Sequence, residues 1–512
     1  MVGSRHSPVK GQSGGNLGER DLTYQVDVHP HSPIAQLPGV RMAPLPATGM
    51  VQASIDLPDM CDYPTPEDKA DALLAVAAEV EHALLVQYLY SAYSLKNRND
   101  PTLNMDQQKA VGRWKTGPVG IAQIAREEMG HLMTVQNLRI LLGFGPTFQR
   151  DEFPMLPDLF PFAFHLGPLT QKTLAEYVIA ESPTNDATHP KLPDIAKLAA
   201  CQAGMPINHV GNLYGLLGVV FAASPEEIRR DAAQNDPWYV MVRDIAAAAY
   251  QQDPSPEAWH LGDDSFGAAK LPQAEATDLQ VSLGNTQPPH PGIRLWQCAN
   301  RADAKAALRD IGLQGEGAAQ LSGEESHFQR FYDIFTGAND FLPFPAEGEW
   351  VPTSAVPTDP TISDDDSDPD AITEPRAKDY ATLADLRYAL VLGLLGHYLV
   401  TDPARRKALK LGDWAIQEMG NLKSLSATLI GLPRSKAGPG GGTAALPFGL
   451  PDELVPPTTE DDSRALLVDR FRRVIEQEDH LFVTYNDGAM MNARDDHKKK
   501  LALLEQQVPA TS

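Results

Sequence analysis

The sequence predicts an all-α protein made of helical bundles, and three observations lead to this fold class. Long segments place apolar residues at helical spacing, and three of these segments carry a carboxylate on the apolar stripe. Two of the three contain the pattern Glu-x-x-His. A four-helix bundle that binds two metal ions needs one Glu from each of two helices and a Glu-x-x-His from each of the other two. We therefore expect such a bundle with a buried metal site.

Residues 1–60 are predicted to form an extension in front of this bundle. They are rich in proline and glycine and show little apolar period. We expect them to wrap around the core or to stay mobile. Their polar, Gly/Ser-rich start lacks the apolar stretch of a secretory signal.

The first helix of the bundle, predicted at residues 67–95, carries Glu81 on its apolar face. A carboxylate in that position is costly unless it is paired or bound to a metal. The apolar face is formed by Leu73, Ala77, Leu84, Leu85 and Tyr88. Three tyrosines are candidates for a pocket wall or a redox tyrosine, with aromatic packing as the simpler interpretation: Tyr88, Tyr90 and Tyr93.

The second helix, predicted at residues 117–143, carries Glu128-Met-Gly-His131 on its apolar stripe. Pro118 at a first-turn position is expected to open the helix, and Gly143 to close it. A Glu and a His three residues apart lie on the same side of a helix. They could form a hydrogen-bonded pair or bind a metal ion.

The last helix of the bundle, predicted at residues 322–335, repeats the pattern as Glu324 and His327. Ser322 and Glu325 match a capping box, so this helix is expected to start there. A second Glu-x-x-His favours the metal interpretation. Five of the six ligands of such a site then have candidates: Glu81, Glu128, His131, Glu324 and His327.

Three of these segments resemble one known family. Residues 79–90 resemble the first helix of the ferritin-like domain of iminophenylpyruvate dimer synthases, and Ile124-Ala-Arg-Glu-Glu-Met-Gly-His131-Leu resembles the second. Residues 314–317 and 326–331 resemble the last helix, so the resemblance covers about residues 60–340. It implies a ferritin-like fold and kinship with enzymes of indolocarbazole and violacein-type pigment assembly. Those enzymes act on an oxidised amino acid, an imine of an aryl pyruvate. They can be much longer than this chain and use other cofactors, so the resemblance does not identify the substrate of this chain.

The third helix departs from the family pattern. Where the family has Gly-Glu-x-Tyr, this chain has Gly211-Asn212-Leu-Tyr214, and a neutral Asn is a poorer metal ligand than a carboxylate. Glu181 could stand in, or could be an N-cap or a surface residue. Glu316, in a glycine-flanked loop, could bind the metal, contact a ligand or shape the turn. The departure leaves a mononuclear or asymmetric site possible.

Two long connections are predicted next. Residues 223–301 are an excursion before the last helix that could shape a pocket or serve as a cover. Residues 341–378 read as a linker with repeated prolines and an acidic run at 363–370, which is expected to be a solvated spacer.

Residues 379–512 are predicted to form a second, degenerate helical bundle. Glu418-Met-Gly-Asn421 repeats the first motif with Asn in place of His, and Glu81 corresponds to Val391. Glu476 and His480 remain one turn apart on a later helix. The expected role is a structural pseudo-repeat that packs on the first bundle or forms a dimer interface, rather than a second metal site.

The composition limits the classes of partner and the compartment. A formal net charge of −24 argues against binding to nucleic acid or to an anionic membrane, and the apolar runs are too short to span a bilayer. Three cysteines with no metal-ligand spacing favour a reduced, cytoplasmic setting: Cys61, Cys201 and Cys298. The expected partner is a small-molecule substrate, with a homodimer as the candidate assembly.

Carboxylate and imidazole ligands suit iron or manganese, and the cysteines are not placed to favour copper(I) or zinc. The sequence therefore predicts a site for one or two iron ions, with manganese as the other candidate. The working hypothesis is a metal-dependent oxidase or oxygenase of secondary metabolism, with a di-iron centre as the first candidate, that acts on an amino-acid-derived compound. Two alternatives stay open: a metal-free imine-coupling or structural protein, and a ferroxidase or iron-handling protein.

Overall fold

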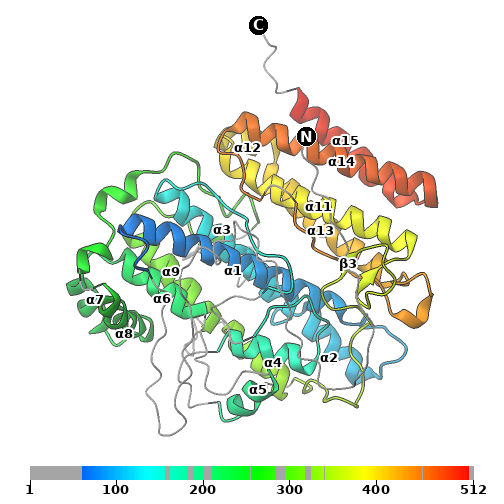
Figure 1. Cartoon of the computed structure of the whole chain (residues 1–512), viewed down its shortest axis with the longest axis horizontal. Coiled ribbons are helices and arrows are strands. Elements are labelled where there is room, and N and C mark those ends of the chain that lie inside the picture. Colours follow the sequence, from blue (N-terminus) through cyan, green and yellow to red (C-terminus); the bar gives the residue numbers. More distant parts are fainter. Residues whose placement is uncertain are drawn as a thin grey trace, which may run out of the picture.

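The computed structural model describes residues 60–155, 162–182, 189–199, 210–253, 255–280, 282–283, 294–316, 325–339, 341–451 and 454–506. These residues form an all-α fold with two minimal parallel sheets, β1 with β2 and β3 with β4 (Figure 1). The predicted extension, residues 1–60, falls almost wholly outside the described residues, as do Cys201, Ser322 and Glu324.

The elements have the following bounds. The helices up to residue 340 are α1 (Pro66–Ser94), α2 (Met105–Thr116), α3 (Ile121–Leu141), α4 (Gln171–Ala180), α5 (Leu192–Leu198), α6 (Val210–Phe221), α7 (Pro225–Ala232), α8 (Pro237–Gln252), α9 (Arg301–Glu316) and α10 (His327–Thr336). The later ones are α11 (Pro375–Val400), α12 (Pro403–Leu409), α13 (Leu411–Ile430), α14 (Glu460–Tyr485) and α15 (Gly488–Glu505). Short 3-10 helices lie at Pro256–Ala258, Asp263–Gly267 and Pro439–Gly441. The strands are β1 (Ser282–Leu283), β2 (Arg294–Leu295), β3 (Thr361–Ile362) and β4 (Ala371–Ile372).

The first bundle is built on the long pair α1 and α3. Helix α1 starts at a capping box in which Thr65 and Asp68 satisfy each other's backbone N–H groups. Nearly every side chain of α3 is buried. The rest of the bundle consists of shorter helices, with α6 packed against α9 and against α1, and α4 packed against α10.

Two predicted helix starts are wrong by about one turn. Helix α3 begins at Ile121 rather than at Pro118, because the chain turns after α2 and Gly120 takes the N-cap position. Helix α10 begins at His327 rather than at Ser322, since the side chain of Ser326 caps it by accepting from the Gln329 N–H. The predicted end at Gly143 is confirmed by its left-handed backbone, with φ +85°.

The excursion between α6 and α9 covers one side of the first bundle. Helix α8 packs on α6 and α9, where the glycines of those helices allow close approach. A Cβ atom at Gly312 of α9 would lie 2.2 Å from the Trp238 ring of α8. The tight contact shows that this part of the excursion is packed against the bundle.

Helices α11, α13, α14 and α15 form a second bundle beside the first (Figure 1). Polar contacts join the two: the Tyr388 hydroxyl of α11 meets the imidazole of His82 in α1. Arg406 of α12 donates to the backbone carbonyl of Gln273 at 2.8 Å. Residues 364–369 of the acidic run are exposed, but the preceding segment packs on the first bundle, where Tyr90 donates to the Pro357 carbonyl at 2.5 Å.

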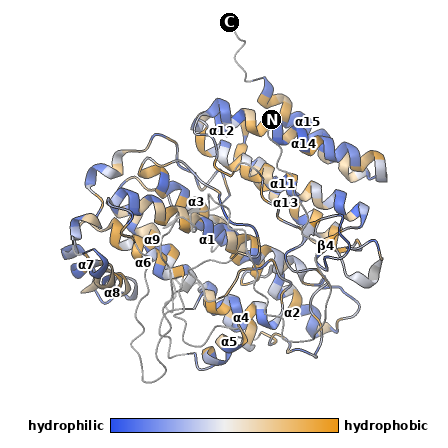
Figure 2. Cartoon of the chain, in the orientation of Figure 1, coloured by the Kyte–Doolittle hydropathy of each residue, from blue (hydrophilic) through white to orange (hydrophobic). Residues whose placement is uncertain are grey.

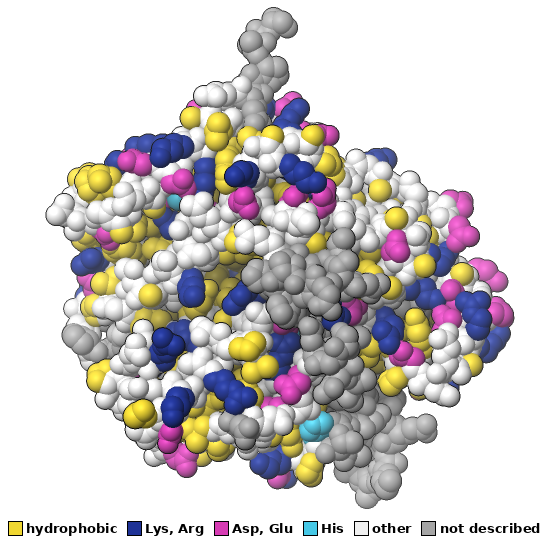
Figure 3. All heavy atoms as spheres, turned by 180° about the vertical axis from the view of Figure 1, so that it is seen from behind, with side chains coloured by type: hydrophobic (Ala, Val, Ile, Leu, Met, Phe, Trp, Pro, Cys, Tyr) yellow, Lys and Arg dark blue, Asp and Glu magenta, His cyan; other side chains and the backbone are white. Residues whose placement is uncertain are grey.

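Two helices, α1 and α11, are long and apolar enough to cross a membrane by length and composition alone (Figure 2). The apolar windows of these helices are 78% and 83% buried inside the protein, as is usual for core helices. On the face shown in Figure 3, acidic and basic side chains are interspersed without a broad patch of one sign.

Candidate metal centre

Two overlapping groups of carboxylates and imidazoles meet in the core of the first bundle. One group is Glu81, Glu128 and His131, and the other is Glu128, Glu181 and His327. In each group the potential ligand atoms lie within 4.8 Å of one another. All five side chains are buried, and the most exposed of them, His131, is 4% accessible. Glu128 belongs to both groups and therefore lies at their centre.

The helices supply these side chains in a simple way. Glu128 and His131 lie three residues apart on α3 and point to the same side. Glu81 comes from the facing side of α1. Glu181 is the C-cap residue of α4, and His327 is the first residue of α10. Two of the five groups thus come from helix ends rather than from helix interiors.

Glu128 offers one oxygen to each histidine. Its Oε2 lies 2.8 Å from His131 Nδ1, and its Oε1 lies 2.9 Å from His327 Nδ1. Glu81 Oε2 is 3.3 Å from the same His131 nitrogen, and Glu181 Oε1 is 3.9 Å from His327 Nδ1. The arrangement has two halves that share the Glu128 carboxylate.

Three potential ligand atoms in this centre lie in ion-pair contact with one another or with His131 but form no well-aligned hydrogen bond among the described residues: Glu81 Oε2, Glu128 Oε1 and His327 Nδ1. A buried polar atom without a partner costs free energy, and a buried charge costs more. Three carboxylates converge on the same space, so a cation would both coordinate these atoms and balance the charge. The residues present therefore fit one or two divalent metal ions.

The far side of each imidazole ring is held by a hydrogen bond. His131 Nε2–H donates to Gln314 Oε1 at 3.0 Å, and His327 Nε2–H donates to Glu127 Oε2 at 2.8 Å. With Nε2 engaged in this way, each ring turns Nδ1 toward Glu128. Such outer contacts fix the tautomer and orientation of a metal-binding histidine.

Two tyrosines hold the outer carboxylates. Tyr88 donates its hydroxyl to Glu181 Oε1 at 2.5 Å, and Tyr214 donates to Glu81. The Tyr88 ring also packs against Phe331, with 5.0 Å between ring centres. Tyr88 therefore packs as an aromatic side chain, as the simpler interpretation expected, and also contacts a carboxylate of the centre.

The pKa values of the metal-free centre show how crowded the charges are. Burial and the nearby Glu128 raise the pKa of Glu81 and of Glu181 to about 7. Burial would also raise the pKa of Glu128, but His327 and His131 outweigh it and hold that pKa well below its usual range. Burial lowers and the carboxylates raise the pKa of His327, which reaches about 9. Protons on the histidines thus take the place of other cations, and metal binding would release them.

The structure brings together four of the five predicted ligands: Glu81, Glu128, His131 and His327. The fifth, Glu324, lies outside the described residues. Glu181 is neither an N-cap nor a surface residue, because it caps the C-terminal end of α4 and is 1% exposed. It brings a third carboxylate to the centre, beside those of Glu81 and Glu128. Glu316 ends helix α9 rather than lying in a loop, and its side chain is outside the described residues.

Sequence reasoning missed the residues that orient the ligands. Glu127 is next to Glu128 but points to the other side of His327, where Arg330 forms a two-contact ion pair with it. Gln314 and Arg330 lie in the segments that resemble the last helix of the family. This resemblance was the sequence signal that could have identified them. Their polar side chains on buried helix faces could have been read as partners of the histidines.

Gly130, inside the Glu128–His131 motif, allows strand β2 to lie against α3. A Cβ atom at this position would be 2.3 Å from the carbonyl oxygen of Arg294. We expect Gly130→Ala to lower the free energy of unfolding by roughly 1–3 kcal/mol, because backbone must move. Urea unfolding would measure the change. The matched control is Gly420→Ala in the second bundle, where a Cβ meets no atom within 4 Å, and which should be neutral or slightly stabilising.

Comparison with known proteins agrees with this geometry. A family model described as "Ferritin-like" matches residues 74–254. The chain is 24% identical over 426 residues to "Dichlorochromopyrrolate synthase" from Lentzea aerocolonigenes, covering 78% of this chain and 37% of that protein. It is 24% identical over 479 residues to "2-imino-3-(indol-3-yl)propanoate dimerase" from Chromobacterium violaceum, covering 88% of this chain and 41% of that protein.

The chain thus spans about 40% of the length of the curated relatives it matches. No solved structure matches the chain significantly. The family match begins within α1 and continues through α8, and it includes Glu81, Glu128, His131 and Glu181. The chain therefore carries a ferritin-like domain at residues 74–254 and is distantly similar to these two enzymes.

Proposed function

We propose that this protein is a metal-dependent, di-iron oxidase or oxygenase of secondary metabolism. The observation that carries the proposal is Glu128, whose two oxygens face the two histidines from the middle of the centre. A carboxylate in this position can hold two metal ions at once. Carboxylates together with imidazoles suit iron and manganese, and no described cysteine belongs to either group.

The ligand set divides naturally into two halves. Glu81 and His131 would hold one ion, Glu181 and His327 the other, and Glu128 both. When bound, a pair of reduced irons can react with dioxygen and supply oxidising power to a substrate. The protein's part is to hold the ligands before the metal arrives, and Gln314 and Glu127 do so by fixing the two imidazole rings.

The surroundings of the centre keep water away from the second half. Rings from α1, α4 and α10 pack next to Glu181, with 4.7 Å between the ring centres of Tyr88 and Tyr177 and 5.4 Å between those of Tyr177 and Phe331. In a dry site, charges act on one another more strongly than in water. The Tyr88 hydroxyl gives Glu181 a fixed hydrogen bond there and holds a proton beside the ligand.

The substrate class rests on the relatives. One of them is named for dimerising 2-imino-3-(indol-3-yl)propanoate, an imine derived from an amino acid. We propose that this chain also acts on an amino-acid-derived compound of that kind. Because it covers only part of those relatives, its own product can differ from theirs.

The first experiment is to measure metal content in the purified protein by mass spectrometry. We expect nearly two irons per chain in the wild type, and loss of both in Glu128→Gln, which keeps the shape but removes the shared charge. Glu418→Gln is the matched control, since Glu418 occupies the corresponding motif position in the second bundle and is also buried. It should leave the iron content unchanged.

The possible outcomes separate the proposal from its alternatives. One metal per chain would contradict a di-iron centre and favour a mononuclear site. If the protein binds no metal after anaerobic loading with ferrous iron, the proposal is wrong, and metal-free acid–base chemistry at the histidines is favoured. Iron that is taken up and stored far beyond two per chain, without consumption of dioxygen in the presence of imines, would favour an iron-handling protein.

A further inference from the structure

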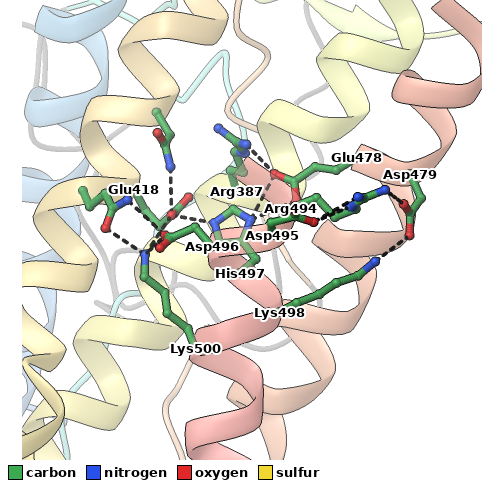
Figure 4. A network of polar contacts seen from close by, with 12 residues as sticks. Arg387, Glu418, Glu478, Asp479, Arg494, Asp495, Asp496, His497, Lys498 and Lys500 are labelled. Atoms are coloured by element: carbon green, nitrogen blue, oxygen red, sulfur yellow. Dashed lines mark hydrogen bonds and ion pairs between the residues drawn. The ribbon is translucent and has the colours of Figure 1, made fainter. Parts of the chain in front are cut away.

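The buried charges of the second bundle are paired with one another (Figure 4). His497 of α15 lies between Glu418 of α13 and Glu478 of α14, at 2.7 and 3.0 Å. Arg387 of α11 forms an ion pair with Glu478. Two carboxylates are thus matched by an imidazolium and a guanidinium, so the charges of this cluster balance without a bound ion.

Sequence reasoning pointed to a different pair on α14, Glu476 and His480. The His480 side chain is 48% exposed and contacts Asp379 at 3.0 Å, so this histidine is not part of the buried cluster. Among the described residues, the groups that could hold a metal ion lie only in the first bundle. A site with unmatched charge lies elsewhere, on the surface of the first bundle.

A hollow of about 510 Å³ lies between α2 and the loop that joins α1 to α2. Small-molecule sites usually have volumes of about 300–1,000 Å³. Three basic side chains line the hollow, Arg98, Lys109 and Arg113, and no acidic residue is among the described residues that line it. The whole chain has 67 acidic and 43 basic residues. The hollow is therefore a local excess of positive charge on an acidic protein.

Two of the three basic side chains are available to a ligand. The Arg98 guanidinium forms no ion pair or hydrogen bond with another residue that the structure describes. Lys109 pairs with Asp106 at 3.5 Å, and these side chains are 72% and 84% exposed. An ion pair as exposed as this one contributes little energy, so the Lys109 ammonium can turn to another anion.

The third basic side chain, Arg113, is held in place before any ligand arrives. Its guanidinium lies 3.7 Å from the centre of the Phe341 ring and donates to the Asn339 carbonyl at 3.1 Å. Neither contact neutralises the guanidinium, because a ring face and a carbonyl carry no net charge. A side chain that is already ordered loses less entropy when a ligand binds to it.

The chemistry of the lining indicates the class of ligand. A guanidinium presents parallel N–H groups that match two oxygens of a phosphate or a carboxylate. Met105 also lines the hollow, and it is 73% exposed, so it offers an apolar wall beside the basic groups. A ligand with an anionic head group and an apolar body would use both parts of the lining.

We propose that this hollow binds a small organic anion, whose head group is a phosphate or a pair of carboxylates and whose apolar body lies against Met105. None of the residues that line it belongs to the two ligand groups of the first centre. The inference therefore goes beyond the proposed function and does not depend on it.

The test is isothermal titration calorimetry of the full chain at low ionic strength with three probes: phenyl phosphate, phenylmalonate and inorganic phosphate. We expect one phenyl phosphate or phenylmalonate per chain, bound roughly tenfold more tightly than inorganic phosphate, which has no apolar body. Because the two organic probes share a phenyl ring, the tighter one identifies the head group. Added salt should weaken binding.

Charge variants locate the site. Arg98→Gln and Lys109→Gln should each weaken binding of the organic probes about tenfold. Lys197→Gln on α5 is the matched control, because Lys197 and Asp194 form a similarly exposed pair with the same spacing, 78% and 83% exposed. It should bind the probes as the wild type does. Glu128→Gln should also bind them unchanged, since it disables only the first centre.

Gly112→Leu tests the shape of the hollow without changing its charge. A Cβ atom at Gly112 would lie in ordinary contact with Arg98, 3.5 Å from its Cβ. The fold should therefore tolerate a side chain there, with a melting temperature no lower than wild type, while the leucine fills the hollow and abolishes binding. The proposal is overturned if no probe binds the wild type, or if Gly112→Leu, Arg98→Gln and Lys109→Gln bind as the wild type does. Loss of binding in Glu128→Gln would place the probes at the first centre and would also contradict it.

Discussion

Stripping the metal from the wild-type protein with a chelator is expected to lower its melting temperature strongly. A metal present at 1,000 times its dissociation constant stabilises the folded state by about 4 kcal/mol. For a bundle of this size the shift in melting temperature should be on the order of 10 °C. The reason is local: without a cation, the carboxylates of Glu81, Glu128 and Glu181 face one another in a buried space.

The loss of stability on metal removal should grow with pH. The direction of this pH dependence follows from the pKa values of the metal-free centre. Glu81 and Glu181 reach a pKa of about 7 in the folded state, above their ordinary value of 4.5. The folded chain then binds more protons than the unfolded chain, so its stability falls as pH rises from about 4.5 through 7. His327, with its pKa raised from 6.5 to about 9, extends the fall to about pH 9. Metal binding, in contrast, tightens as the ligands lose protons.

Differential scanning calorimetry with and without chelator at pH 6 and pH 8 would measure both effects. The difference should be larger at pH 8. Glu128→Gln should show no difference at either pH, while Glu418→Gln should show the full difference of the wild type. If the chelator leaves the wild-type melting temperature unchanged at both pH 6 and pH 8, this result would contradict a metal centre in the first bundle.

Helical periodicity in the sequence was sufficient to predict the all-α fold and most of the first centre. Glu81, Glu128, His131 and His327 lie on buried helix faces, and a buried carboxylate at helical spacing is visible in a sequence. The helix starts were less predictable. The N-cap positions of Gly120 and Ser326 depend on how the preceding chain turns. Pro118 before α3 and the capping-box pattern before α10 each indicated a start that was too early.

The residues whose roles the sequence left open or did not indicate are those that depend on neighbours far apart in sequence. Glu181 ends a short helix, and only the contact between α4 and α10 brings it to His327. In the second bundle, alignment with Glu81 led to Val391, while the buried charge is Arg387 one turn earlier. Helix α14 buries Val474, Glu478 and Leu481, so Glu476 and His480 lie outside its buried face.

A second large effect is expected when the ion pair behind His327 is broken. Arg330 donates to both oxygens of Glu127, at 3.1 and 2.5 Å, and the two side chains are 4% and 1% exposed. Removing either partner leaves a buried charge without its match. We expect Arg330→Met and Glu127→Gln each to lower the free energy of unfolding by about 3–5 kcal/mol. Urea unfolding of both variants would measure this.

The double variant Glu127→Gln/Arg330→Met separates the two roles of the pair. It buries no charge at this position, so most of the lost stability should return, as it does when a buried ion pair is replaced as a unit. Metal affinity should stay roughly 10–100-fold below wild type, because a neutral amide holds the His327 imidazole less firmly than a carboxylate. In Arg330→Met the Glu127–His327 contact remains, so affinity should fall less despite the lower stability. If metal affinity instead follows stability across all three variants, Glu127 does not orient His327 for the metal, and the ion pair only supports the fold.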